Sequence, residues 1–153
     1  MKRPRRQSLK IPAALAALAI AAVAAIVSLP GAPEAVAPAV CAAAEVAPRG
    51  TTVVSYSPGC AERYAAAGKK TVLFFRAYWC GACADAAAHI ADEAASGPAD
   101  LVVIEVDYDD SEALKRRYGV TLQHTFVQVD AEGNELGQWM GFGALGELYA
   151  ALR

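Results

Sequence analysis

The feature that most constrains this 153-residue chain is a pair of cysteines two residues apart, in the segment Trp-Cys-Gly-Ala-Cys at 79–83. A short apolar run at 71–75 precedes the pair, and residues 71–77 predict a strand that is buried on both faces. The alanine-rich segment that follows is typical of a helix. Cys80 therefore falls at a helix N-terminus, where unpaired N–H groups and the helix dipole favour a thiolate. Cys83 follows one turn later, so the pattern predicts thiol–disulfide exchange.

The first 29 residues predict an export signal or a membrane anchor. Residues 1–10 carry five Lys or Arg and no acid, and residues 11–29 carry no charge. A basic region before an apolar one is typical of an export signal, and 19 residues are enough to span a bilayer. The small residues at 35–37 resemble a cleavage site, although Pro38 follows them. Cleavage and anchoring both stay open, and either places the remainder outside the cytoplasmic membrane of a bacterium.

The chain after residue 29 divides into a linker and one folded domain. Residues 30–50 are rich in Pro and Ala without periodicity, which is typical of a linker, and residues 51–153 are the expected domain. Cys41 lies in the linker and is expected to be an exposed thiol. Cys60 is expected to be a half-buried thiol, with a Cys41–Cys60 disulfide as the alternative. The net charge of −2 gives no indication of nucleic-acid binding.

The pattern of the domain predicts alternating strands and helices. Expected strands cover residues 51–55, 71–77, 101–107, 125–130 and 135–140. Expected helices cover residues 60–67, 80–96, 111–118 and 144–152. Strands joined through helices are expected to run parallel, whereas the tight turn at 131–134 forces an antiparallel pair. The prediction is an α/β fold, with a mixed central sheet flanked by helices on both faces.

These segments resemble the thioredoxin superfamily. The resemblance rests on the order of elements, the Trp-Cys-x-x-Cys motif, residues 118–127 (Tyr-Gly-Val-Thr-Leu-Gln-His-Thr-Phe-Val), Val106-Asp107, Asp130-x-x-Gly133 and Gly141. It covers about residues 51–153 and implies a thioredoxin fold. Together with the N-terminal segment, it makes the chain similar to exported or membrane-anchored bacterial thioredoxin-like proteins.

The resemblance implies a thiol–disulfide oxidoreductase in which Cys80 attacks and Cys83 resolves the mixed disulfide. Trp79 would pack beside the site and shield it, while Gly81 and Ala82 would set the turn and tune the potential. Ala82 stands where thioredoxins have proline. The implied partners are protein thiols or disulfides of the cell envelope and a membrane or periplasmic redox protein. No cofactor is expected, and the direction of electron flow stays open.

Two positions depart from the pattern of the family. Phe74 stands where thioredoxins have a buried aspartate that relays protons to the second cysteine, and no carboxylate replaces it nearby in sequence. His124 stands where they have a cis-proline, between Gln123, whose backbone would pair with substrate, and Thr125. A cis bond before a residue other than proline costs about 3–4 kcal/mol. The Gln123–His124 bond is therefore predicted to be trans, in a rebuilt loop.

His124 leaves three roles open. It could fill the space of the proline and hydrogen-bond a carbonyl, or it could stabilise the Cys80 thiolate as an imidazolium. It could also join Cys80 and Cys83 as a ligand of Cu(I) or Zn²⁺. The last role gives an alternative function, a copper or other soft-metal binding protein. A redox-inert thioredoxin-like interaction domain is the second alternative.

Overall fold

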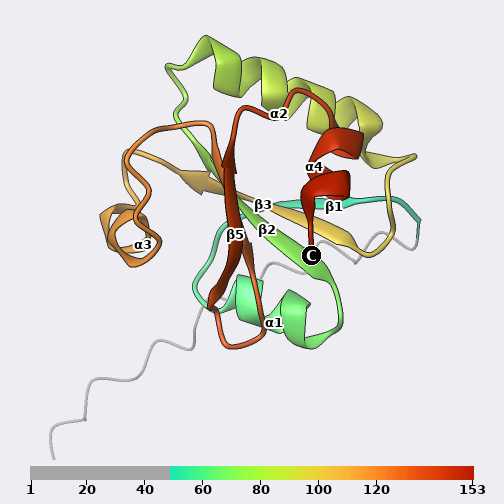
Figure 1. Cartoon of the computed structure of the whole chain (residues 1–153). Coiled ribbons are helices and arrows are strands. Elements are labelled where there is room, and N and C mark those ends of the chain that lie inside the picture. The colour runs from blue at the N-terminus through green and yellow to red at the C-terminus, as the bar shows by residue number, and fades with distance from the viewer. Residues whose placement is uncertain (1–48) are drawn as a thin grey trace, which may run out of the picture. The chain divides into compact units, whose positions relative to one another are not determined.

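The computed structural model describes residues 49–153, in which a five-stranded sheet carries helices on both faces (Figure 1). The predicted order of elements and the α/β class are confirmed. The strands are β1 (Thr52–Ser55), β2 (Lys70–Arg76), β3 (Leu101–Asp107), β4 (Thr125–Val129) and β5 (Glu135–Met140). The helices are α1 (Cys60–Ala66), α2 (Gly81–Ala94), α3 (Glu112–Arg117) and α4 (Leu145–Ala151).

The sheet is mixed, with strand order β1-β3-β2-β4-β5. β3 pairs in parallel with β1 and β2, whereas β4 pairs antiparallel with β2 and β5. The prediction that strands joined through helices run parallel is therefore wrong for β4. The connection that contains α3 starts and finishes at the same end of β2, because Tyr108 N–H donates to Arg76 O and His124 N–H donates to Phe75 O. The chain thus reverses direction without crossing the sheet.

Two apolar cores lie on opposite faces of the sheet, because successive side chains of a strand point to opposite sides. On β2, Leu73 and Phe75 join the core under α1, while Val72 and Phe74 join the core under α2 and α4. The second core includes Cys83 and receives mostly small residues from α2. The predicted burial of β2 on both faces is confirmed.

Gly50 begins the packed part of the described chain. Its φ is +87°, and a Cβ there would lie 2.4 Å from the Ala94 carbonyl oxygen, so only glycine fits against the end of α2. Cys60 is fully buried and disulfide-bonded, so the expectation of a half-buried thiol is wrong. Cys41, the predicted segment 1–29 and most of the predicted linker lie outside the described residues. Within 49–153, no helix has the length and apolar character needed to cross a membrane.

Candidate active site

The two cysteines occupy the start of α2, as the sequence predicts. Cys80 is the N-cap, with extended backbone angles, and its Sγ accepts a hydrogen bond from the Cys83 N–H at 3.3 Å. Neither cysteine is in a disulfide. Cys80 is half-buried, whereas Cys83 is completely buried beneath the helix. The structure therefore presents one accessible sulfur and one concealed sulfur, a turn apart.

The surroundings of the two thiols move their pKa values in opposite directions. Hydrogen bonds from the side chain and the backbone N–H of Cys83 lower the pKa of Cys80, and the Gln123 side chain adds to this effect. Burial, followed by the hydrogen bond to Cys80, raises the pKa of Cys83 to about 11. Near neutral pH the accessible sulfur is thus the better nucleophile, and the buried sulfur holds its proton.

Trp79 is anchored at the rim of the site by a residue that the sequence analysis missed. Its indole Nε1–H donates to Asp109 Oδ2 at 2.8 Å, and two-thirds of the side chain is exposed. The expected packing of Trp79 is therefore only partial. Asp109 follows β3 and is 30 residues away in sequence, so no local pattern links it to the tryptophan.

His124 fills the position at which the family has proline. The described residues contain no cis peptide bond, so the predicted trans bond is confirmed. The residue adopts a φ of +65°, which is uncommon without glycine. Its backbone N–H donates to Phe75 O at 2.9 Å, and its Nε2 lies 3.3 Å from Phe142 O. The space-filling role with a hydrogen bond to a carbonyl is the role that this geometry favours.

A hydrogen bond between flanking residues closes the loop that contains His124. Thr125 Oγ1 donates to Leu122 O at 2.7 Å, on the far side of Gln123 and His124. Phe74 stacks on Phe126, with ring centroids 4.4 Å apart. The position of the family aspartate is therefore occupied by an aromatic stack beneath Cys83, which belongs to the same core.

The other two predicted residues of the motif lie in the first turn of α2. Gly81 and Ala82 are both exposed, and a Cβ at Gly81 would meet no atom within 4 Å. The Ala82 backbone N–H contributes to the lowered pKa of Cys80. This part of the turn is open to an approaching substrate.

The soft-metal alternative lacks a preformed set of ligands. No group of three or more His, Cys, Asp or Glu side chains within residues 49–153 is placed to hold a metal ion. The Nε2 atom of His124 instead faces the carbonyl of Phe142. Cys80, Cys83 and His124 are neighbours in the fold without forming a metal site.

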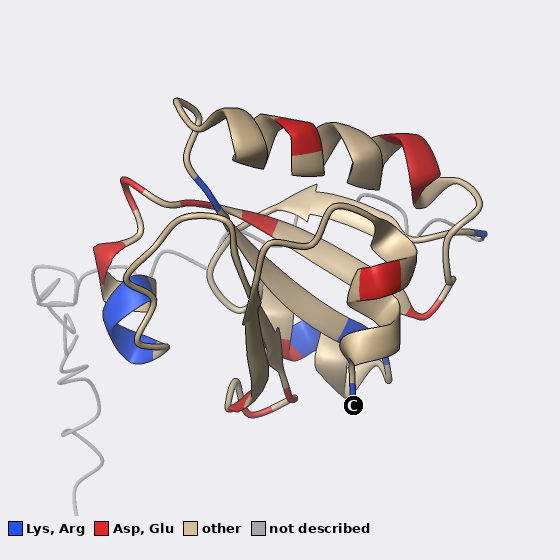
Figure 2. Ribbon diagram, turned by 45° about the horizontal axis from the view of Figure 1, so that its top comes forward, with Lys and Arg blue, Asp and Glu red and all other residues tan. Residues whose placement is uncertain are grey.

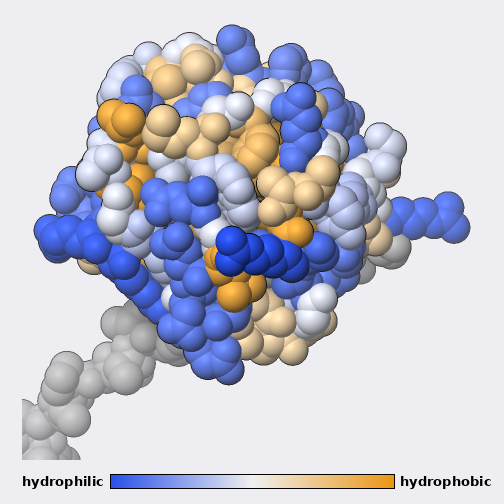
Figure 3. All heavy atoms as spheres, viewed as in Figure 1, coloured by the Kyte–Doolittle hydropathy of each residue, from blue (hydrophilic) through white to orange (hydrophobic). Residues whose placement is uncertain are grey.

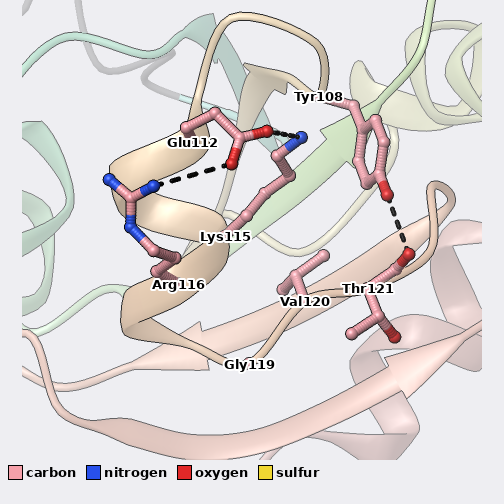
Figure 4. Close-up of a pocket in the computed structure, with 7 residues that line it drawn as sticks. All are labelled: Tyr108, Glu112, Lys115, Arg116, Gly119, Val120 and Thr121. Atoms are coloured by element: carbon pink, nitrogen blue, oxygen red, sulfur yellow. Dashed lines mark hydrogen bonds and ion pairs between the residues drawn. The ribbon is translucent and has the colours of Figure 1, made fainter.

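A pocket of about 360 Å³ lies beside α3 (Figure 4). Lys115 lines it, with Nζ 2.6 Å from a Glu112 carboxylate oxygen and 4.1 Å from the centre of the Tyr108 ring. Tyr108 donates its hydroxyl to Thr121 O at 2.8 Å. The polar groups of this pocket satisfy one another, and no cysteine lines it.

Comparison with known proteins agrees with this geometry. The family model described as Thioredoxin matches residues 60–152, and the chain belongs to the thioredoxin family. The members of this family are thiol–disulfide oxidoreductases that act on protein thiols or disulfides.

Solved structures show the same fold. Trxlp from Edwardsiella tarda EIB202 has a TM-score of 0.55 at 24% identity, covering 66% of this chain and 98% of that chain. Thioredoxin from Schistosoma mansoni has a TM-score of 0.52 at 20% identity, covering 65% of this chain and 91% of that chain. At these identities the likeness shows the thioredoxin fold, whose mixed sheet was predicted from the sequence.

Proposed function

We propose that this protein is a bacterial, extracytoplasmic thiol–disulfide oxidoreductase that uses Cys80 and Cys83 on protein substrates. The observation that carries the proposal is the asymmetry of the pair. Cys80 is accessible with a lowered pKa, whereas Cys83 is buried with a pKa of about 11. Cys80 is suited to attack the substrate disulfide. Cys83 is suited to react afterwards, when a mixed disulfide on Cys80 lies next to it.

The reaction follows from this division of roles. The Cys80 thiolate attacks a substrate disulfide, forms a mixed disulfide and releases one substrate thiolate. Cys83 then loses its proton and attacks the Cys80 sulfur, which releases the second substrate thiolate and leaves a Cys80–Cys83 disulfide. Two electrons pass to the substrate, and a redox partner restores the dithiol. The same steps in reverse oxidise a substrate dithiol, so the potential of the pair decides the direction.

Exposed apolar side chains support a protein substrate. Among the described residues, the large hydrophobic side chains that are most exposed belong to Tyr78, Trp79, Leu122 and Met140. Tyr78 and Trp79 precede Cys80, Leu122 lies in the His124 loop, and Met140 pairs with Thr125 across β4 and β5. Figure 3 shows hydrophobic residues interspersed with hydrophilic ones over one face of the molecule. Apolar contacts around the thiol can hold an extended polypeptide while exchange proceeds.

The basic and apolar N-terminal segment supports the extracytoplasmic location and a partner in or near the membrane. A membrane-impermeant maleimide applied to intact cells tests this location, because it reaches Cys80 only outside the cytoplasmic membrane. Labelling of the wild type above the level of Cys80→Ser is the expected result. Equal labelling of both proteins in intact cells, with a difference after lysis, would contradict an external site.

Redox titration of the full chain tests the activity. The protein is equilibrated with glutathione buffers, and Trp79 fluorescence and thiol alkylation are followed. We expect a reversible two-electron transition between about −120 and −270 mV. The Cys80→Ser/Cys83→Ser double variant removes this transition and provides the signal of Cys41 and Cys60. A wild type without any transition beyond that control would exclude the oxidoreductase proposal.

A further inference from the structure

The resolving step needs a proton acceptor for Cys83. The sulfur is completely buried, and its pKa of about 11 leaves only a small fraction as thiolate at neutral pH. Phe74 and Phe126, which belong to the same core, have no ionisable groups. Neither of these neighbours can therefore accept the proton of Cys83.

Strand register brings a carboxylate to this face of the sheet. Glu105 of β3 is paired with Phe74 of β2, so their backbones lie about 4.8 Å apart. Side chains alternate along β3, and Leu101 and Val103 point into the core that contains Cys83. Glu105 follows Val103 by two residues, so it lies on the same face of the sheet. We call this face, which also carries Cys83, the cysteine face. The chain has no carboxylate at position 74, where the family has aspartate, but it has Glu105 on the adjacent strand.

Glu105 is held in an ion pair with Arg76 of β2. Arg76 Nη1 lies 2.9 Å from Glu105 Oε1, and each side chain is only 23% exposed. Arg76 also lies on the cysteine face, two residues after Phe74, with its guanidinium 5.0 Å from the centre of the Tyr78 ring. The Arg76 Nε atom is buried without a hydrogen-bond partner within the described residues. A buried donor of this kind is costly in a purely structural ion pair.

The other charged or titratable groups near this end of the cysteine face are engaged or exposed. Asp107 Oδ1 accepts the backbone N–H groups of Asp109 and Asp110, and His124 Nε2 faces the Phe142 carbonyl. Asp85 of α2 is exposed to solvent. The loop that joins β5 to α4, residues 141–144, carries no charged side chain. Glu105 is thus the half-buried carboxylate of this face that is held by a side chain and not by backbone N–H groups, so it is our candidate for proton exchange with Cys83.

We propose that Glu105 is the acid–base residue of the resolving step and that Arg76 is its counter-cation. This role rests on the proposed function of the cysteine pair. The Cys83 thiol passes its proton to the Glu105 carboxylate, directly or through one water, and Arg76 remains the charged partner of Glu105. The Cys83 sulfur bonds to the Cys80 sulfur, the bond from Cys80 to the substrate sulfur breaks, and the departing thiolate takes the proton. Charge, protons and electrons balance.

Stopped-flow reaction of the reduced full chain with 5,5′-dithiobis(2-nitrobenzoate) separates the two steps. The first release of nitrothiobenzoate reports attack by Cys80, and the second reports resolution by Cys83. In Glu105→Gln we expect the second phase to slow about 100-fold at pH 7 while the first phase keeps its rate. The second phase of this variant should also rise steeply toward alkaline pH, more than that of the wild type. The Cys80→Ser/Cys83→Ser variant measures the signal of the other thiols.

The chain offers a matched control in a second Glu–Arg pair. Glu62 lies 3.5 Å from Arg117 and belongs to α1, on the other face of the sheet. Glu62→Gln should leave both phases unchanged. The Arg76→Gln/Glu105→Gln double variant replaces the ion pair with neutral groups of similar shape, a change that folded proteins often tolerate. It provides the test of the second phase if Glu105→Gln does not fold.

The outcomes separate this role from the function on which it rests. A second phase that keeps the wild-type rate in Glu105→Gln, or in the double variant, overturns the role of Glu105. Equal slowing of both phases also overturns it, because the change would then act on the whole site. A wild type without a second phase overturns the proposed function and this role together.

Discussion

At the scale of single residues, the site depends on two sulfurs in different surroundings. Cys80 caps α2 and receives hydrogen bonds, whereas Cys83 is buried beneath the same helix. The redox role of these two residues was predictable from sequence, because a Cys-x-x-Cys pair at the start of a helix has few other uses. The degree of burial of Cys83 was not, because it depends on Phe74 and Phe126, which come from two strands.

Trapping experiments test the assignment of attacking and resolving sulfurs. Cys83→Ser leaves a mixed disulfide on Cys80 without its resolving thiol, so disulfide-linked substrate complexes should accumulate on non-reducing gels. Cys80→Ser retains only the buried sulfur of the pair and should trap few or none through it. Equal trapping by the two variants would contradict the division of roles.

The stability of the reduced protein should fall at alkaline pH because of Cys83. Its pKa is about 9 when unfolded and about 11 when folded, so the folded state favours the protonated thiol. This contribution is fully present below pH 9 and is lost as pH rises toward 11. Between pH 8 and 10 we expect a loss of about 1 kcal/mol in the free energy of unfolding, measured with urea. The Cys83→Ser variant should not show this loss of about 1 kcal/mol. If its free energy of unfolding depended on pH in the same way as that of the wild type, the loss could not be assigned to Cys83.

The positive φ of His124 gives a paired prediction. His124→Ala and His124→Gly both lose the ring contacts and the hydrogen bond to Phe142 O. They differ in the Cβ, which is disfavoured at a φ of +65°. His124→Ala should therefore be less stable than His124→Gly by about 1 kcal/mol in urea unfolding. The reverse order of stability would show that this loop changes its backbone on substitution.

At the scale of elements, the strand–helix order was predictable and the direction of β4 was not. Hydrophobic runs, glycines and the tight turn at 131–134 gave bounds within a few residues of those observed, as in α2, expected at 80–96 and found at Gly81–Ala94. The direction of β4 depends on whether the chain crosses the sheet, which spacing alone does not specify. Glu105 was missed for a related reason, because its place opposite Phe74 is a matter of strand register.

Close packing between the end of α2, the start of β1 and α4 gives a prediction at this scale. A Cβ at Gly97 would lie 2.5 Å from both Leu145 Cδ2 and Thr51 Oγ1. Gly97→Ala should therefore destabilise the fold by about 1–3 kcal/mol. Gly146→Ala, where a Cβ meets nothing within 4 Å, should instead stabilise α4 by about 0.5–1 kcal/mol. Thermal unfolding compares the two, and loss of stability in both would contradict this account.

At the scale of the whole described domain, charge is distributed unevenly. Residues 49–153 carry nine basic and fourteen acidic side chains, whereas residues 1–10 carry five basic ones and no acid. The charged residues of α2 are all acidic, while the last turn of α3 is basic (Figure 2). The sequence predicted the charge contrast between the first ten residues and the domain. The contrast between α2 and α3 needed the fold, because the two helices come from separate segments.

The strand order has a consequence for self-association. β1 and β5 lie at the two edges of the sheet, where unpaired N–H and C=O groups could pair with another copy. β1 has only four residues, and β5 carries Gly137 and a register irregularity against Gln128 and Val129 of β4. Short or irregular edges are poor templates for a further strand. The domain can therefore expose apolar side chains around Cys80 to substrates while its sheet edges resist fibre-like growth.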